Sequence, residues 1–364
     1  MKNKKIIIGG GGTGGHIFPA ISIAKAIRKR SPETEILFVG AVNKIEMEKV
    51  PEAGFEIIGL PVIGLQRKLS LRNFTFFIKL YKSMRMAAKI IKDFKPDVVI
   101  GVGGYASGPI LKAAASRSIP TLIQEQNSYA GLTNKLLSIK AKKIFVAYEG
   151  MEKYFPAEKL ILTGNPVRPD LVSLSGSNDE AYESFGLKKD LPVILILGGS
   201  LGAGTINQSI LKRIDSIPDE VQILWQCGKY YYENLKSKVD NLKRENIKLL
   251  AFISEMNKAF HVADLIISRA GAGTISELTL VGKAVILVPS PNVAEDHQTK
   301  NALALVGKSA AMMIPDKEAE ERLIKTGLDL LKDNIKREEL SENISKLVLT
   351  DSADRIVDEI FRMI

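Results

Sequence analysis

The sequence predicts an α/β protein made of two doubly wound parallel-sheet domains, and three observations lead to this fold class. The chain has 364 residues, more than the roughly 100–200 residues at which one core usually stops growing. Short β-branched runs alternate with longer helical patterns, as in parallel sheets covered by helices on both faces. The two halves also begin alike, because 5–15 and 193–202 each read as an apolar strand, a glycine-rich turn and a helix start.

The apolar runs give the expected strands in chain order. In the first half they are Ile6–Ile8, Glu35–Val39, Val98–Ile100, Thr121–Ile123 and Ile144–Val146. In the second half they are Val193–Leu197, Gln222–Trp225, Leu265–Ile267 and Val285–Val288. Each set is expected to form its own sheet.

The join between the domains is expected after Gly164–Pro169, where two prolines interrupt helix and strand and a polar stretch follows. We place the linker near 165–190 and divide the chain into 1–168 and 169–349. The last helical pattern, about 352–363, can pack on either domain, and we assign about 350–364 to the first.

Composition bounds the class of protein. The chain is 45% hydrophobic and 25% charged, which suits a globular protein with two cores. Its single cysteine, Cys227, has no disulfide partner, as expected in a reducing cytosol. The basic start, Met1–Lys5, leads into an apolar run too short for a signal peptide. No stretch approaches the roughly 20 apolar residues of a membrane span. We therefore expect neither export nor a spanning helix.

The net charge of +10 favours an anionic partner. Lipid headgroups, nucleotides and nucleic acid all fit this sign, and many basic proteins bind nothing acidic. Charge alone therefore leaves the partner open.

The first glycine turn, Gly9–Gly15, contains a Gly-x-Gly-x-x-Gly match. Glycines there let backbone amides and a helix amino terminus approach an oxyanion, usually a phosphate. A nicotinamide enzyme would also need an acidic residue near the end of the second strand, and 40–44 supplies none. His16 follows in the first turn of the helix, where the macrodipole favours the neutral imidazole. It can act as a base or merely hydrogen-bond the turn.

Two further strand ends of the first half carry glycines or polar residues, at Gly101–Pro109 and Gln124–Asn127. Because the carboxyl ends of parallel strands meet at one edge of a sheet, these segments are expected to converge with the His16 turn. Three such strand ends in one domain indicate a site.

The second half repeats the phosphate-binding pattern at Gly198–Gly204, where Ser200 can donate to a phosphate oxygen. After the strand at 265–267, Ser268–Glu277 opens a helix whose Glu277 can accept both hydroxyls of a ribose, or can be an ordinary first-turn acid. Glu295–Gln298 groups donors and acceptors suited to sugar hydroxyls, or to a helix start. No cluster has metal-ligand spacing, so we expect neither metal nor cofactor.

Together these motifs resemble the MurG family of GT-B glycosyltransferases. The resemblance rests on Gly-Gly-Thr-Gly-Gly-His16 with Pro19, Gly101–Pro109, Glu-Gln-Asn127, Gly-Asn-Pro-Val-Arg168, Gly-Gly-Ser200 and the run from Arg269 to Glu277. It spans residues 6 to about 310. It implies two Rossmann-like domains separated by a cleft, and inverting transfer of N-acetylglucosamine from UDP-GlcNAc to the 4-hydroxyl of MurNAc in lipid I without an essential metal. It further implies a role in peptidoglycan synthesis, and with it in cell shape and division.

The resemblance also assigns residues. Ser200 would meet the donor phosphate, the Ile253 backbone the uracil, Glu277 the ribose and Gln298 the sugar hydroxyls. The remaining substrate-binding positions would be Ala272, Gly273 and Thr274 along the diphosphate, and Thr13, Gly14, Gly15, Asn127 and Arg168 from the opposite side of the cleft. An inverting displacement needs a base for the attacking hydroxyl; His16 is our candidate, with Glu125 as the alternative. The family pattern leads us to expect a larger residue at Gly273 and a variable segment at 292–294.

A basic, apolar stretch predicts contact with a membrane. Gly64–Lys95 contains nine Lys or Arg against one acid, Asp93, with bulky apolar residues between them. Such a helix suits an anionic lipid interface at the cytoplasmic face of the membrane, although an amphipathic helix can also face only a core. The cluster Phe74–Ile78 is dense for a single inward stripe, which favours peripheral membrane contact.

Two rival functions differ in class. One is another GT-B UDP-sugar enzyme, such as a lipid glycosyltransferase or an epimerase; the matches at Gly101–Pro109 and Glu125–Asn127 argue against it. The other is a noncatalytic, basic nucleotide- or RNA-binding protein, which would not explain the ribose, sugar and acceptor sets together. We therefore expect UDP-GlcNAc, lipid I and an anionic membrane surface as partners, and no nucleic acid.

Overall fold

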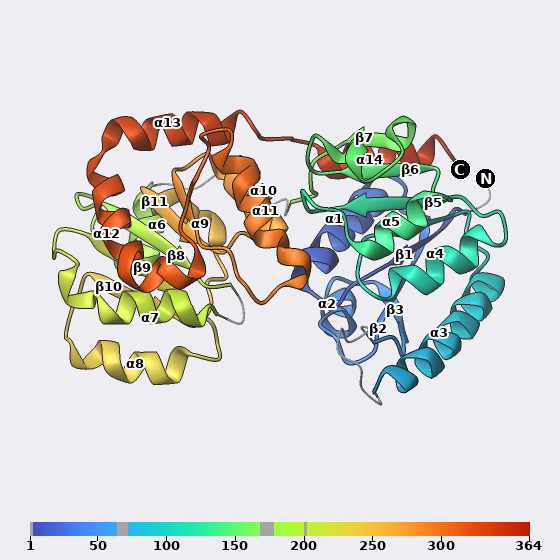
Figure 1. Cartoon of the computed structure of the whole chain (residues 1–364), viewed down its shortest axis with the longest axis horizontal. Helices are drawn as coiled ribbons and strands as arrows, with labels where there is room; N and C mark the ends of the chain where they lie inside the picture. Colours follow the sequence, from blue (N-terminus) through green and yellow to red (C-terminus); the bar gives the residue numbers. More distant parts are fainter. Residues whose placement is uncertain (1–2, 64–71, 168–177, 200–201) are drawn as a thin grey trace. The chain divides into compact units, whose positions relative to one another are not determined.

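A computed structural model describes residues 3–63, 72–167, 178–199 and 202–364 of the chain. It divides into two units, which we call the first unit (1–167 with 349–364) and the second unit (168–348). Each unit contains one parallel sheet between helices (Figure 1). The predicted fold class, two Rossmann-like doubly wound domains, is confirmed.

The first unit has a seven-stranded sheet with the order β3-β2-β1-β4-β5-β6-β7. Its strands are β1 (Lys5–Gly9), β2 (Glu35–Ala41), β3 (Glu56–Leu60), β4 (Val98–Gly101), β5 (Thr121–Glu125), β6 (Lys143–Val146) and β7 (Leu160–Leu162). Its helices are α1 (Gly14–Arg30), α2 (Glu46–Glu52), α3 (Arg72–Phe94), α4 (Ser107–Ala115), α5 (Leu132–Ser138) and α14 (Ser352–Phe361).

The second unit has a six-stranded sheet with the order β10-β9-β8-β11-β12-β13. Its strands are β8 (Val193–Leu197), β9 (Gln222–Gln226), β10 (Ile247–Leu250), β11 (Leu265–Ser268), β12 (Val285–Leu287) and β13 (Met312–Met313). Its helices are α6 (Asn178–Phe185), α7 (Gly204–Lys212), α8 (Tyr232–Asn241), α9 (Met256–Val262), α10 (Ala272–Val281), α11 (His297–Val306), α12 (Ala319–Lys332) and α13 (Asn334–Ser345).

Alternation along β1 builds two cores in the first unit, one on each face of the sheet. Ile7 packs in a cluster with Ile91 of α3 and Ile110 of α4. Ile6 and Ile8 pack in another cluster with residues of α1 and α14. Because Ile6, Ile7 and Ile8 are all buried, on one face of the sheet or the other, this central run has no polar position.

The last helix, α14, belongs to the first unit and packs against α1. Ile356, Val357 and Ile360 are buried there, and Asp358 forms an ion pair with Arg30. The chain therefore returns to its first sheet after completing the second.

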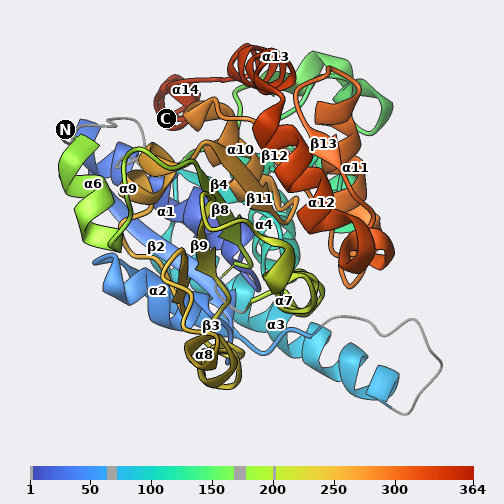
Figure 2. The same cartoon turned by 90° about the vertical axis from the view of Figure 1, so that its left-hand side faces the viewer.

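The amino-terminal part of α3 extends beyond the rest of its unit (Figure 2). From 77 to 82 every side chain is exposed, and the inward stripe begins only at Ser83 and Ala87. Residues 64–71, the start of the predicted basic stretch, lie outside the described residues.

Candidate functional site

Each sheet has one point where the strand order reverses, between β1 and β4 in the first unit and between β8 and β11 in the second. Doubly wound sheets bind ligands outside the carboxyl ends of the strands at such a switch point. The loops after β1 and β4 are the first glycine turn and Gly101–Pro109, and those after β8 and β11 are Gly198–Gly204 and Arg269–Glu277. Four of the predicted motifs therefore lie at the two switch points, while Gln124–Asn127 and Glu295–Gln298 follow the neighbouring strands β5 and β12.

The two glycine loops of the first unit interlock through their backbones. Gly11 N donates to Gly103 O over 3.2 Å. A Cβ added to Gly104, which has φ +82°, would lie 2.1 Å from Gly11 O. Only glycine allows this approach, so the two loops form one fixed surface.

A buried carboxylate that sequence reasoning missed supports the first glycine turn. Glu46, the first residue of α2, is 0% exposed. Its Oε2 accepts from Gly12 N over 2.8 Å and its Oε1 from Ala41 N over 2.9 Å. The sequence has no acid at 40–44, where the dinucleotide-binding motif expects one. The acid stands two residues further on, and it binds the chain's own turn.

His16 lies in the first turn of α1, beside the interlocked loops. Its Nδ1 lies 3.1 Å from the hydroxyl of Thr13, the N-cap residue. The other edge of the ring rests on Gly103, where an added Cβ would come within 2.6 Å of Cδ2 and 2.8 Å of Nε2. Gly14 and Gly15 complete the turn, so four predicted positions lie together.

Alanine at Gly103 is expected to displace the imidazole of His16. The new methyl group would overlap the ring, and φ +93° is strained for alanine, at about 1–2 kcal/mol. We expect kcat to fall at least tenfold, measured as UDP release, with a modest loss of stability. Gly108→Ala is the matched control, since its Cβ would lie an ordinary 3.6 Å from Thr133. Equal kcat in the two variants would contradict this placement of His16.

Glu125, at the end of β5, is buried and surrounded by donors. Its Oε1 accepts from N and Nδ2 of Asn127 over 3.1 and 3.2 Å. Its Oε2 accepts from Gly131 N over 3.1 Å and from Asn134 Nδ2 over 2.9 Å. Burial raises the pKa of the Glu125 carboxyl, and these donors oppose the rise. Such a carboxylate organises the loop that carries Asn127.

Amides on either side of Glu125 connect this loop to the neighbouring strands. Gln126 Nε2 donates to Val102 O over 2.7 Å, and Gln124 Nε2 to Asn165 Oδ1 over 2.9 Å. Asn165 in turn donates to Gln126 O over 3.0 Å. The strand ends after β4 and β5 are thus bonded to one another and to the segment after β7.

The glycine turn of the second unit is closed by backbone contacts. Gly198 N donates to Gln226 O over 3.0 Å, and Gly202 N to Gly199 O over 3.1 Å. A Cβ on Gly202 would lie 2.6 Å from the ring of Tyr231, so this ring supports the turn. Two predicted binding residues, Ser200 here and Arg168 before the second unit's first helix, lie outside the described residues.

Helix α10 begins at the other side of this switch point. Ala272 is buried, while Gly273, Thr274 and Glu277 are half-buried in the first turns. A Cβ added to Gly273 would meet nothing within 4 Å. The unit itself therefore has room for the larger residue expected there, and the glycine is no steric requirement of the protein fold.

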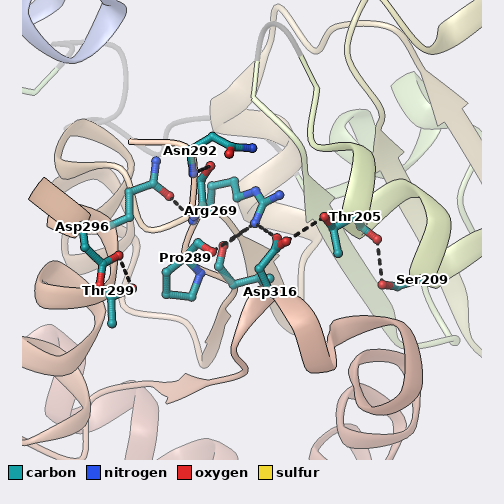
Figure 3. A network of polar contacts seen from close by, with 11 residues as sticks. Thr205, Ser209, Arg269, Pro289, Asn292, Asp296, Thr299 and Asp316 are labelled. Atoms are coloured by element: carbon teal, nitrogen blue, oxygen red, sulfur yellow. Dashed lines mark hydrogen bonds and ion pairs between the residues drawn. The ribbon is translucent and has the colours of Figure 1, made fainter. Parts of the chain in front are cut away.

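An ion pair fixes the loop before α10 (Figure 3). Arg269 pairs with Asp316 and donates to Val288 O over 3.0 Å. The second oxygen of Asp316 accepts from Thr205 of α7 over 2.8 Å. Because both charged side chains are largely buried, this network holds together the start of α7 and the segments after β11, β12 and β13.

The expected sugar and uracil positions are also held by hydrogen bonds. Gln298 Oε1 accepts from Ser290 N over 2.9 Å. Just before it, Glu295 and Asp296 both have left-handed backbones, with φ 55° and 50°, an uncommon conformation that clusters at functional sites. Ile253 N donates to the buried Gln226 Oε1 over 2.9 Å. The Ile253 N–H is therefore already bound to Gln226. A uracil placed at this backbone would meet the Ile253 carbonyl and this occupied N–H.

The described residues contain no group of three or more His, Cys, Asp or Glu that could hold a metal ion. Burial raises the pKa of the Cys227 thiol to about 11, so this cysteine is protonated at neutral pH.

Both halves of the chain match domains of one known family of glycosyltransferases. Residues 6–146 match the N-terminal domain of glycosyltransferase family 28, and residues 193–356 match its C-terminal domain. The UDP-N-acetylglucosamine–N-acetylmuramyl-(pentapeptide) pyrophosphoryl-undecaprenol N-acetylglucosamine transferase of Parabacteroides distasonis is 56% identical over 100% of this chain and 99% of its own. The protein of the same name from Flavobacterium psychrophilum is 52% identical, with the same coverage.

Solved structures agree. MurG of Acinetobacter baumannii superposes with a TM-score of 0.80 at 29% identity, over 99% of each chain. A UDP-GlcNAc 2-epimerase from Neisseria meningitidis reaches a TM-score of 0.67 at 15% identity, which is a likeness of fold alone.

Proposed function

The chain belongs to the MurG family of GT-B glycosyltransferases, and from this premise we propose that it transfers N-acetylglucosamine from UDP-GlcNAc to the MurNAc of lipid I, giving lipid II. The observation that carries the proposal is identity of 56% to a transferase of this name over the whole chain. The two switch points, each with a glycine turn and a helix amino terminus, support this proposal because such turns suit a diphosphate.

In the first unit we propose that His16 removes the proton from the attacking 4-hydroxyl. In the tautomer whose Nδ1–H donates to the Thr13 hydroxyl, 3.1 Å away, Nε2 carries the lone pair and is the atom proposed to take the proton. The hydroxyl oxygen then bonds to C1 of the sugar from the side opposite UDP, as the bond to the diphosphate breaks. Inversion at C1 follows from this geometry of attack. Thr13, Gly14, Gly15, Asn127 and Arg168 are proposed to bind the acceptor.

In the second unit we propose that the amino end of α10 and the turn at Ser200 stabilise the departing diphosphate. Unpaired N–H groups at a helix start favour an anion there, and preorganised dipoles of this kind supply much of a transition state's stabilisation. Ala272, Gly273 and Thr274 would line the diphosphate, and Glu277 would accept from the ribose. The Ile253 backbone would meet the uracil and Gln298 the sugar. No metal is required by this scheme.

The direct test is incubation of the purified protein with UDP-GlcNAc and a lipid I analogue, with and without EDTA. Disaccharide product and stoichiometric UDP release that survive EDTA are expected. Product lost with EDTA and restored by a divalent cation would overturn the metal-free scheme. Absence of product with several acceptor chain lengths, while UDP still binds, would point to a different UDP-sugar enzyme.

We further propose that the first unit binds the anionic surface of the cytoplasmic face of the membrane as a peripheral protein. Phe77 and Tyr81 of α3 are 63% and 66% exposed, among Lys79, Lys82 and Arg85. Apolar side chains with interspersed cations suit a lipid interface. None of the helices in the described ranges is long and apolar enough to cross a bilayer.

A second exposed stripe lies on α5 of the same unit. Leu132 and Leu136 of α5 and its C-cap residue Ile139 are all exposed at a spacing of four and three residues, which places them on one side of the helix. Lys135 and Lys140 flank the stripe. Two apolar and basic surfaces in one unit support the membrane proposal. We also propose a role in cell-wall synthesis, and with it in cell shape and division. No nucleic acid is proposed as a partner.

The double replacement Phe77→Ser and Tyr81→Ser is expected to weaken vesicle binding at least tenfold. Full burial of one such side chain contributes about 1.5–3 kcal/mol, and partial insertion of two exceeds the 1.4 kcal/mol of a tenfold change. Cosedimentation with vesicles containing anionic phosphatidylglycerol measures it, and binding of the wild type should fall with added salt. Ile335→Ser is the control, an apolar residue that is 82% exposed in the second unit. Turnover of a soluble, short-chain acceptor should stay unchanged, and an equal loss in the control would contradict the proposal.

A further inference from the structure

We propose that Glu46 is a positioning residue for the acceptor side of the reaction. Its carboxylate occupies the anion-binding position of the first glycine turn and thereby fixes the segment that carries Thr13 and His16. This inference deepens the proposed function and rests on it. Glycine turns of this kind usually face a phosphate; here the oxyanion at Gly12 N is supplied by the chain itself.

The contacts of Glu46 show a carboxylate built into the turn. Each oxygen accepts one backbone N–H, at 2.8 Å from Gly12 and 2.9 Å from Ala41. A buried charge is costly unless it is hydrogen-bonded, and hydrogen bonds to an ionised group are stronger than those between neutral groups. The side chain therefore links the end of β2 to the turn after β1 through two strong bonds.

The surrounding backbone leaves space for this carboxylate. A Cβ on Gly11 would lie 2.3 Å from Cδ of Glu46, and a Cβ on Gly40 would lie 2.6 Å from its Cγ. Any larger residue at either position would push the carboxylate away. Two glycines from separate strand ends thus accommodate one acidic side chain.

Glu46 supplies the last anchor before the reacting segment. Three successive amides of the turn are bound: Gly10 N to Val39 O, Gly11 N to Gly103 O, and Gly12 N to Glu46. Of these three acceptors only Glu46 is a side chain, so only it can be removed by substitution. Thr13 follows directly and binds His16. Loss of the anchor should release the segment that positions both.

Because these contacts lie within the first unit, acceptor turnover should suffer while donor binding does not. In Glu46→Gln the amide keeps one acceptor oxygen but turns an NH2 group toward the second N–H. We expect kcat to fall about 10- to 100-fold, the range for a misplacement of about 1 Å. The KM for UDP-GlcNAc should stay within about threefold of wild type, because Glu46 lies in the first unit and Glu277 and the start of α10, proposed to bind the donor, lie in the second.

The control is Glu48→Gln, two residues further on, where the carboxylate is 69% exposed. The second variant is Gly40→Ala, which displaces the Glu46 carboxylate without removing it and is expected to reproduce the loss of kcat. It also keeps the test possible if Glu46→Gln does not fold.

Hydrogen exchange of the free protein, followed by mass spectrometry, provides a readout that needs no substrate. Exchange in the peptide covering 9–18 should rise at least tenfold in Glu46→Gln, while peptides of the second unit stay unchanged. Wild-type kcat in both Glu46→Gln and Gly40→Ala would overturn the proposal. So would unchanged exchange at 9–18, or an equal rise throughout both units. A wild-type protein that makes no disaccharide would instead overturn the proposed function, and the exchange result would stand independently.

Discussion

Replacement of His16 by alanine is expected to lower kcat by about 10²- to 10⁴-fold, the usual contribution of a general base. The imidazole lies half-buried at the first switch point, with Nδ1 3.1 Å from the Thr13 hydroxyl. Since the variant removes only the proton acceptor of the first unit, the dissociation constant for UDP should not change. Stopped assays of disaccharide formation and calorimetric titration with UDP measure the two quantities.

His261→Ala is the matched control, because His261 lies on α9 of the second unit. It should retain the wild-type kcat. A His16→Ala variant that keeps more than a tenth of wild-type kcat would remove the imidazole from the mechanism and leave Glu125 as the candidate. That carboxylate accepts from four donors, so we expect Glu125→Gln to loosen the Asn127 loop and lower thermal stability.

The second large effect is expected in donor binding. Glu277→Ala should weaken UDP binding by about 10²- to 10⁴-fold, because two hydrogen bonds from the ribose to a carboxylate would be lost, each contributes about 1.5–3 kcal/mol, and about 1.4 kcal/mol is a tenfold change. Glu277 is half-buried in the first turns of α10, beside the positions proposed for the diphosphate. Isothermal titration with UDP gives the dissociation constant directly.

A ligand without the ribose hydroxyls makes this test specific. For 2′,3′-dideoxy-UDP the wild type and Glu277→Ala should bind equally, since neither can form the bonds in question. Gln298→Ala should leave UDP binding unchanged, because Gln298 is assigned to the sugar. If Glu277→Ala lost affinity for UDP and for the dideoxy ligand alike, Glu277 would be a structural residue of α10 and the ribose assignment would fail.

The central strands of both sheets could be predicted from sequence, and the four that were missed share one position. β3 and β7 are the edges of the first sheet, and β10 and β13 are the edges of the second. Central strands of a parallel sheet are apolar on both faces and give continuous runs. At an edge the burial is partial, as in the alternating pattern of β3, and β13 has only two residues. Such segments carry little apolar signal.

The site could be predicted as far as it is local in sequence. Glycine turns, His16 and Glu277 each lie within about ten residues of the strand that presents them. Glu46 and Asp316 were missed because they act on partners 34 and 47 residues away. Each looks like an ordinary helix-start acid until the fold brings it to its partner, and no spacing rule connects them.

The position of α14 has a consequence for synthesis on the ribosome. Ile6 and Ile8 are covered in part by Ile356, Val357 and Ile360, which emerge only after the whole of 168–348. At about 5–20 residues per second, translation of that stretch takes roughly 10–40 s. During this interval the face of the earliest sheet that α1 covers lacks the part of its cover that α14 supplies. The unit that is translated first is therefore the last to be completed.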